Sequence, residues 1–168
     1  MAIELRDARP EDADEIAALH LRCWRHNYKG LMDQAALDGI DDKVWAERRH
    51  KRLGNLTTGN KLLVACEGKR ILGFCDAGPS RHSEIAPVEV YAMYVDPAAQ
   101  GKGVGALLMR GMLDFLKTDQ GQAKVMVKTL LTNPQSRKFY EKLGGKFIGE
   151  SSFDFVGKKY PEAIYVYD

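Results

Sequence analysis

Three glycines at alternate positions, directly before a predicted helix, constrain this sequence more than any other feature. They lie in the segment DPAAQGKGVGALL, residues 96–108, which opens into an apolar run with helical spacing. The preceding segment, VEVYAMYVDP, is rich in β-branched and aromatic residues, as strands are. The first amides of a helix have no intrahelical partner, and the helix dipole adds roughly half a positive charge there. Because glycine lets the backbone approach an anion without an intervening Cβ, this turn is predicted to bind a phosphate-containing ligand.

Several phosphate-binding motifs can be compared with these glycines. A dinucleotide-binding fingerprint is matched formally by Gly101, Gly103 and Ala106, but that motif belongs near the first strand of a parallel repeat, and here it follows about four strands. A Walker A loop requires Gly-Lys-Ser/Thr, which does not occur in the sequence. A tight turn without a ligand would not need three alternate glycines. A nicotinamide-dependent oxidoreductase therefore remains an alternative on the glycines alone.

Composition narrows the class of protein. The 168 residues fit one domain, and 45% hydrophobic with 29% charged residues is ordinary for a soluble globular chain. A net charge of +2 argues against a nucleic-acid partner, and no apolar run is long enough to cross a membrane. The N-terminus lacks a signal-peptide pattern, and Cys23, Cys66 and Cys75 have no metal-site spacing. We expect a cytoplasmic protein with reduced thiols, no metal, no membrane association and no bound nucleic acid.

The periodicity of apolar residues predicts one mixed α/β domain over residues 1–168, without repeats or linkers. The expected elements, in chain order, are a strand at 3–7, helices at 10–24 and 41–54, a hairpin of strands at 61–66 and 70–78, a strand at 88–97, a helix at 104–116, a strand at 124–130, a helix at 134–145 and strands at 146–153 and 163–168.

Two motifs about 30 residues apart carry a family resemblance. Gln100-x-x-Gly103-x-Gly105 resembles the Q/R-x-x-G-x-G/A signature of the GNAT acyltransferase superfamily, and NPQSRKFYEKLGGKF, residues 133–147, resembles its second motif. One departure is Gly145, where the family often has an aromatic residue, a role that Phe147 could fill. The resemblance covers most of the chain. It implies a single-domain GNAT fold with a mostly antiparallel sheet, splayed fourth and fifth strands and flanking helices.

The resemblance also implies a ligand, an acyl-coenzyme A and most often acetyl-CoA. Backbone amides of residues 101–105 would hold its pyrophosphate, and main-chain groups of Met93 and Val95 would pair with its pantetheine arm like an added strand. The coenzyme-binding residues expected on this basis are Met93, Tyr94, Val95, Gln100, Gly101, Lys102, Gly103, Val104, Gly105, Asn133 and Tyr140.

Acyl transfer from a thioester to an amine requires a base, a donor for the oxyanion and a tolerable leaving group. Glu89, in the signature strand, is the candidate base, because the family often places there a glutamate that works through water. A bulge in that strand would re-aim the side chain. Tyr140 is the candidate acid, at a position where the family commonly has a tyrosine near the coenzyme sulfur. The alternative roles are an ion-paired strand glutamate and a packed helix aromatic.

The acceptor pocket is predicted from the N-terminal half of the chain. Trp24 and Tyr28 lie where family members form this pocket, and Glu89 and Tyr91 would face it from the strand; core packing is the alternative role for the two aromatic residues. The expected activity is an N-acetyltransferase that acts on a small-molecule or peptide amine, and a homodimer is possible. A catalytically silent acyl-CoA-binding module is the alternative. The sequence does not select the acceptor.

Overall fold

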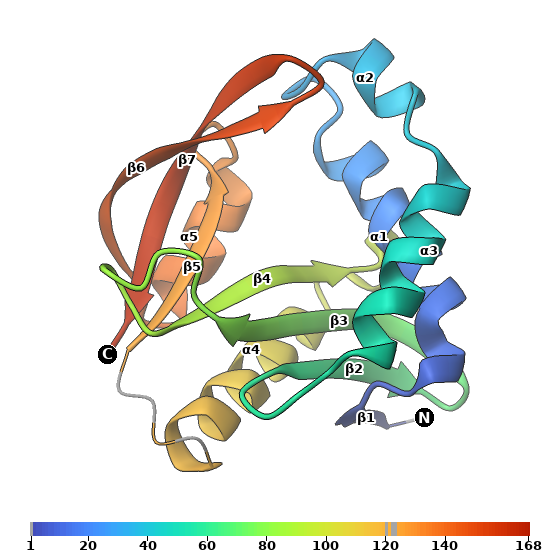
Figure 1. The fold of residues 1–168 in the computed structure, drawn as a ribbon, viewed down its shortest axis with the longest axis vertical. Coiled ribbons are helices and arrows are strands. Elements are labelled where there is room, and N and C mark those ends of the chain that lie inside the picture. The colour runs from blue at the N-terminus through green and yellow to red at the C-terminus, as the bar shows by residue number, and fades with distance from the viewer. Residues whose placement is uncertain (1, 120, 122–123) are drawn as a thin grey trace.

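A seven-stranded mixed sheet forms the centre of the computed structural model, which describes residues 2–119, 121 and 124–168 (Figure 1). The strand order is β1-β2-β3-β4-β5-β7-β6, and every neighbouring pair is antiparallel except β4 and β5. The mixed α/β class and the mostly antiparallel sheet are therefore confirmed. The strands are β1 (Ile3–Asp7), β2 (Lys61–Glu67), β3 (Arg70–Pro79), β4 (Val88–Val95), β5 (Val125–Leu130), β6 (Lys146–Phe155) and β7 (Lys158–Tyr167).

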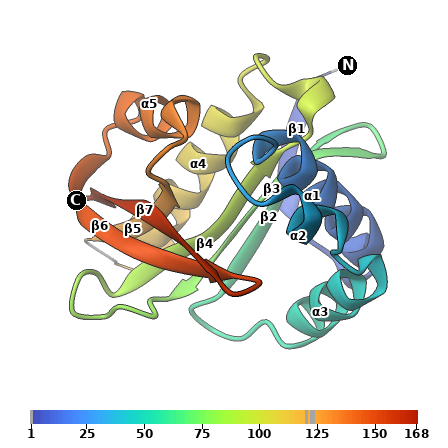
Figure 2. The same cartoon turned by 90° about the horizontal axis from the view of Figure 1, so that it is seen from above.

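Helices cover both faces of the sheet (Figure 2). The helices α1 and α3 lie on one face, and α4 and α5 lie on the other. The central residues of β2 and β3 are buried in unbroken runs, because strands covered on both sides need apolar side chains at every position. No helix of the described residues is long and apolar enough to span a membrane. The helices are α1 (Ala13–Asn27), α2 (Gln34–Asp38), α3 (Asp42–Gly54), α4 (Val104–Asp114) and α5 (Pro134–Lys142).

Two elements differ from the sequence expectation. The short helix α2 was not predicted, although Asp33 caps it by accepting a hydrogen bond from the Ala36 amide and Gly39 follows its last residue. β7 begins at Lys158, five residues before the expected start at Ala163. Its first residues are mostly exposed, so they lack the apolar alternation that marks a half-buried strand.

β4 and β5 separate after a short parallel pairing. Only Val88–Val90 pair with Val125–Val127, so β4 from Tyr91 onward has no neighbour on that side. On its other side β4 pairs with β3, where the register shift between Asp76 and Ala77 leaves Tyr91 as an extra residue. The expected splay and the expected bulge are both present. The splay opens a gap in the sheet beside the start of α4.

His20 of α1 offers a test of the packing of α1 and α3 against the sheet. Its ring centroid lies 4.7 Å from that of Trp45 and 4.6 Å from that of Tyr94, and its Nδ1 lies 3.4 Å from the Arg49 guanidinium. Burial, with the positive charge of Arg49, lowers the pKa of His20 to about 3. Below the ordinary histidine pKa of about 6.5 the unfolded chain therefore binds a proton that the folded chain does not.

We expect this difference to destabilise the fold as the pH falls from 6.5 towards 3. At pH 5 the loss from His20 amounts to up to about 2 kcal/mol in the free energy of unfolding. Urea unfolding at pH 7 and pH 5 measures it, with His20→Phe as the control that retains an aromatic ring. An equal loss of stability in both proteins would contradict the role of His20.

Candidate active site

The glycine-rich turn before α4 has the geometry of an anion site. Gly101 and Gly103 have φ angles of +80° and +82°, and a Cβ at either position would meet no other atom within 4 Å. Within the described part of the chain, no acceptor bonds the backbone N–H groups of residues 101–106. These donors are available to an external anion at the helix N-terminus.

Gly105 has a different reason to be glycine. A Cβ there would lie 3.1 Å from the ring of Phe139, in α5. The missing side chain therefore lets α4 and α5 approach each other. The motif predicts that all three glycines allow phosphate approach, and for Gly105 the structure adds this packing role.

A cavity of about 590 Å³ opens beside this turn, between the splayed part of β4 and the helices α4 and α5. Ten of the eleven predicted coenzyme-binding residues line it. Lys102 does not, because its side chain is exposed outside the cavity. We call it the coenzyme cavity. The predicted residues that line it are Met93, Tyr94, Val95, Gln100, Gly101, Gly103, Val104, Gly105, Asn133 and Tyr140.

Two polar side chains of this cavity are engaged within the protein. The Gln100 amide donates to the Val95 carbonyl at 3.3 Å, which ties the turn to the end of β4. Asn133 caps α5, since its Oδ1 accepts from the Ser136 amide at 3.3 Å and its Nδ2 donates to the Ser136 hydroxyl at 2.9 Å. Both residues therefore have a structural function in addition to their predicted role.

Tyr140 lies in α5 and is 6% exposed. Burial raises the pKa of its hydroxyl well above the usual value, and nearby Cys75, Tyr94 and Tyr167 add to the effect. The hydroxyl has no hydrogen-bond partner among the described residues, whereas the Tyr140 carbonyl accepts from the Tyr167 hydroxyl at 2.8 Å. Tyr140 thus presents a protonated, uncommitted hydroxyl in the coenzyme cavity at neutral pH.

A second cavity, of about 320 Å³, adjoins the first. The two share residues where β4 and β5 diverge, so the gap between these strands connects them. All four predicted acceptor-binding residues, Trp24, Tyr28, Glu89 and Tyr91, line this acceptor cavity. The residues common to both cavities are Tyr28, Val90, Tyr91, Tyr94, Lys128 and Thr129.

Glu89 is buried at the wall of the acceptor cavity, with 1% of its surface exposed. Its Oε2 accepts from the Arg81 Nε at 2.7 Å, while its Oε1 has no partner among the described residues. The side chain is thus both ion-paired, as the structural alternative expected, and open to a further hydrogen bond. The predicted base role is compatible with this position.

Tyrosine hydroxyls meet where the two cavities join. The Tyr28 and Tyr94 hydroxyls are 2.8 Å apart, and burial raises the pKa of both groups, that of Tyr94 to about 12. Trp24 packs edge-on against Tyr28 with ring centroids 5.0 Å apart. Both residues therefore shape the cavity wall and also pack against each other.

Several lining residues of the acceptor cavity were not predicted. They come from the loop after β3, from β5 and from the β6–β7 hairpin, and no local motif marks any of them. Only the strand pairing, which sequence spacing does not reveal, brings these segments together. The charged residues and the histidine among them are Arg81, His82, Lys128, Asp154 and Glu162.

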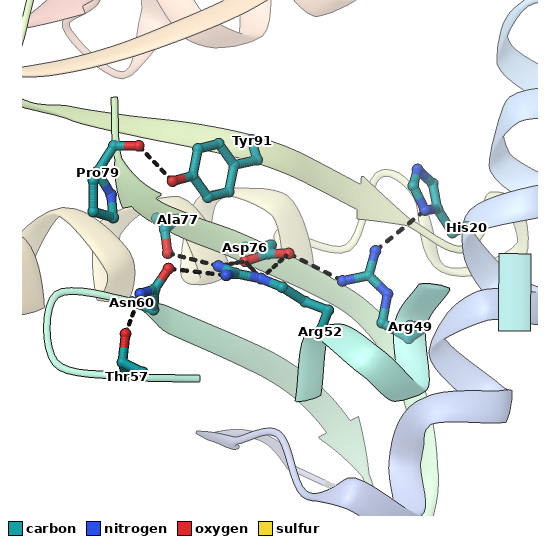
Figure 3. Close-up of polar contacts among 9 residues, drawn as sticks. All are labelled: His20, Arg49, Arg52, Thr57, Asn60, Asp76, Ala77, Pro79 and Tyr91. Atoms are coloured by element: carbon teal, nitrogen blue, oxygen red, sulfur yellow. Dashed lines mark hydrogen bonds and ion pairs between the residues drawn. The ribbon is translucent and has the colours of Figure 1, made fainter. Parts of the chain in front are cut away.

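A buried ion-pair cluster connects α3 to β3 at the position of the strand bulge (Figure 3). Asp76 of β3 accepts from Arg49 at 3.0 Å and from Arg52 at 2.7 Å, and both arginines extend from α3. Arg52 also lies over the ring of Tyr91, 5.3 Å from its centroid, and the Tyr91 hydroxyl donates to the Pro79 carbonyl. The cluster thus joins α3, the middle of the sheet and a residue shared by both cavities.

Within the described residues, no group of three or more histidine, cysteine or acidic side chains could hold a metal ion. The cysteines Cys23, Cys66 and Cys75 are free and buried, as expected for core residues. The Cys23 thiol lies 3.2 Å from the Val95 carbonyl, and burial raises its pKa to about 12. The thiols are therefore placed for packing rather than for nucleophilic chemistry.

Comparisons with known proteins agree with this geometry. The model of the acetyltransferase (GNAT) family matches residues 13–145. A probable N-acetyltransferase of Mycobacterium tuberculosis is 29% identical over 143 residues, covering 83% of this chain and 78% of the relative. The peptidyl-lysine N-acetyltransferase YjaB of Salmonella typhimurium is 32% identical over 170 residues, covering 99% of each chain.

Solved structures share the fold. The PaiA N-acetyltransferase of Thermoplasma acidophilum, in complex with coenzyme A, superposes with a TM-score of 0.73. The superposition covers 97% of this chain and 98% of that chain at 18% sequence identity. At 18% sequence identity this structural similarity shows a shared fold and nothing more.

Proposed function

The chain belongs to the GNAT family of acetyltransferases, and on this premise we propose that it transfers the acetyl group of acetyl-CoA directly to the primary amine of an acceptor, without an acyl-enzyme. The observation that carries the proposal is the row of free backbone amides at residues 101–106, which opens onto a cavity that meets a second cavity between β4 and β5. The family match decides against the nicotinamide alternative.

Binding of the co-substrate rests on main-chain groups. The free amides at the start of α4 would hold the diphosphate, because they and the helix dipole favour an anion there. The edge of β4 from Tyr91 to Val95 would pair with the pantetheine arm, since β5 leaves this edge free. This arrangement directs the thioester towards the junction of the two cavities.

One residue from each cavity would perform the proton transfers. The acceptor ammonium must lose a proton before attack, and Glu89, through its free Oε1 and water, is the proposed acceptor of that proton. The attack moves electrons onto the carbonyl oxygen, where amides of the splayed strand would stabilise the charge. The C–S bond then breaks, and the Tyr140 hydroxyl would protonate the departing thiolate.

The proposed function is tested by coenzyme A release in the presence of a panel of amines, with mass spectrometry of the acetylated products. We expect turnover with at least one primary amine and an increase of product mass by one acetyl group. Binding of acetyl-CoA without turnover across peptides, lysine derivatives and small amines would identify a silent acyl-CoA-binding module instead.

Ala106 provides a charge test of the diphosphate site. It is the third residue of α4, and its side chain lines the coenzyme cavity. Ala106→Asp is expected to weaken acetyl-CoA binding at least about tenfold, because the carboxylate repels the diphosphate. Isothermal titration calorimetry measures this, with Ala106→Asn as the control of equal shape. An acid in the first helical turn does not destabilise a helix, so equal affinity of the two variants would place the diphosphate elsewhere.

A further inference from the structure

We propose that the acceptor is a compact dication, a primary amine joined by a short alkyl chain to a second cationic nitrogen. The inference deepens the proposed function and rests on it, because it assigns the occupant of the acceptor cavity. It is carried by the charges of that cavity and by Oε1 of Glu89, a carboxylate oxygen in its wall that has no partner among the described residues. Neither the family match nor the similar proteins supply this assignment.

The strongest indication is the free oxygen of Glu89. This side chain is 1% exposed, and its Oε1 has no partner among the described residues. A buried acceptor without a partner destabilises the protein, so a bound group that donates an N–H there gains affinity. Ammonium groups carry only donors, and the position at the cavity wall suits the amine that is to react.

Two further carboxylates face the same cavity. Glu162 of β7 is half-buried, and burial raises its pKa, although the charge of Lys128 partly counteracts this effect. Its hydrogen bond from the Ser151 hydroxyl is long, at 3.4 Å. In the described structure neither Glu162 nor Asp154 has a cationic group within 4.0 Å of its carboxylate. A cation bound near Glu162 would offset the cost of burying its carboxylate.

The cavity's own cations are already engaged. Arg81 donates to Glu89 and stacks over the ring of Tyr91 at 5.3 Å. The Lys128 ammonium lies 2.8 Å from the Nε2 of His82. With Arg81 and Glu89 offsetting each other, Lys128 stands against two carboxylates, those of Asp154 and Glu162, so carboxylates outnumber lysine and arginine side chains in the lining. A carboxylate on the acceptor would increase that excess.

The remaining walls fit an alkyl spacer. Apart from Thr129 and Ser152 they are aromatic or apolar, and aromatic faces also attract ammonium groups. A volume of about 320 Å³ is at the small end of ligand cavities, which limits the acceptor to a compact molecule. The apolar and aromatic residues of these walls are Trp24, Tyr28, Met32, Val90, Tyr91, Tyr94, Leu130 and Phe153.

A matched series of amines tests the proposal. 1,4-Diaminobutane, 4-amino-1-butanol and 4-aminobutanoate share one reactive amine and one spacer length, and differ only in a cationic, neutral or anionic far end. A lysine blocked at its α-amine and carboxyl group represents a neutral peptidyl lysine. We expect kcat/KM for the diamine to exceed that for the amino alcohol about tenfold, and that for the amino acid to be lowest.

Two variants test whether the preference for the diamine arises from the carboxylates of the acceptor cavity. Glu162→Gln and Asp154→Asn are each expected to lower the preference for the diamine over the amino alcohol towards one. Glu150→Gln is the control, because it removes the same charge from the same hairpin at a residue that lines neither cavity. A preference that survives both cavity variants would overturn the assignment.

The binding readout separates this proposal from the proposed function. Calorimetry of each amine with the enzyme–coenzyme A complex needs no reaction, and we expect the diamine to bind most tightly. Equal or tighter binding of the amino alcohol, the amino acid or the blocked lysine would overturn the dicationic acceptor and leave acetyl transfer intact. Failure of acetyl-CoA to bind would overturn the proposed function itself.

Discussion

Tyr140→Phe is expected to lower kcat about 100-fold or more while leaving the affinity for acetyl-CoA nearly unchanged. The substitution removes one hydroxyl that has no partner among the described residues, so the fold loses little. Positioned general acids contribute about 10²–10⁴-fold to a rate, and a thiol of pKa about 8.5 leaves tolerably without a proton, which places the effect near the lower end. Steady-state kinetics and calorimetric titration with acetyl-CoA measure the two quantities separately.

The matched control for this prediction is Tyr165→Phe. Tyr165 is also buried in the core, but its hydroxyl binds Arg137 and Glu141, and the residue lines neither cavity. We expect this control to lose stability and to retain its kcat. If Tyr140→Phe weakened acetyl-CoA binding as strongly as it slowed turnover, Tyr140 would be a packing residue.

Asp76→Ala is expected to lower the free energy of unfolding by about 3–5 kcal/mol. Asp76 is 5% exposed and Arg49 is 8% exposed, so removing the carboxylate leaves a buried guanidinium without its ion-pair partner. Burial already lowers the pKa of Arg49, and Asp76 counteracts this effect. Arg52 is more exposed and can turn towards water. Urea unfolding measures the loss.

The double variant Asp76→Leu with Arg49→Met is the control. It removes both buried charges and fills their space with apolar groups, a change that is often close to neutral. We expect it to be clearly more stable than Asp76→Ala. Equal destabilisation by the two variants would show that packing at this position, rather than the unpaired charge, is responsible.

The ion-pair cluster of Asp76, Arg49 and Arg52 also contacts Tyr91, a residue that lines both cavities. Asp76 pairs with Ala92 at the register shift that leaves Tyr91 unpaired, and Arg52 lies over the Tyr91 ring. Loss of the carboxylate should therefore loosen the bulge as well as the core. Variants in this cluster are best compared at a temperature where each protein is fully folded.

Much of the coenzyme side could be predicted because it is local in sequence. The glycine turn, the strand before it and the helix after it lie within about 30 residues, so spacing alone places the free amides. Lys102 is exposed and does not line the cavity although its neighbours do, so spacing alone does not place every side chain of the turn. Phe147 shows a further limit: it is 46% exposed on β6 and packs only partly, against Tyr165, although the sequence suggested a larger role.

The acceptor side could be predicted only where the family resemblance named residues. Trp24, Tyr28, Glu89 and Tyr91 line the cavity as expected, but the sequence could not show that Glu89 is ion-paired to Arg81. That pair joins β4 to the loop before it, and no local motif marks Arg81.

By itself the sequence determined the class of fold, the order of most elements and the glycine turn at the start of α4, because periodicity, capping and glycine conformations are local properties of the chain. Only the tertiary structure decided which charges share the acceptor cavity. Arg81, Lys128 and Glu162 come from three separate segments, and the pairing of β5 with β7 and the limited pairing of β4 with β5 bring them together. Contacts between distant segments depend on how the whole chain packs, so no local pattern encodes the charge of that cavity.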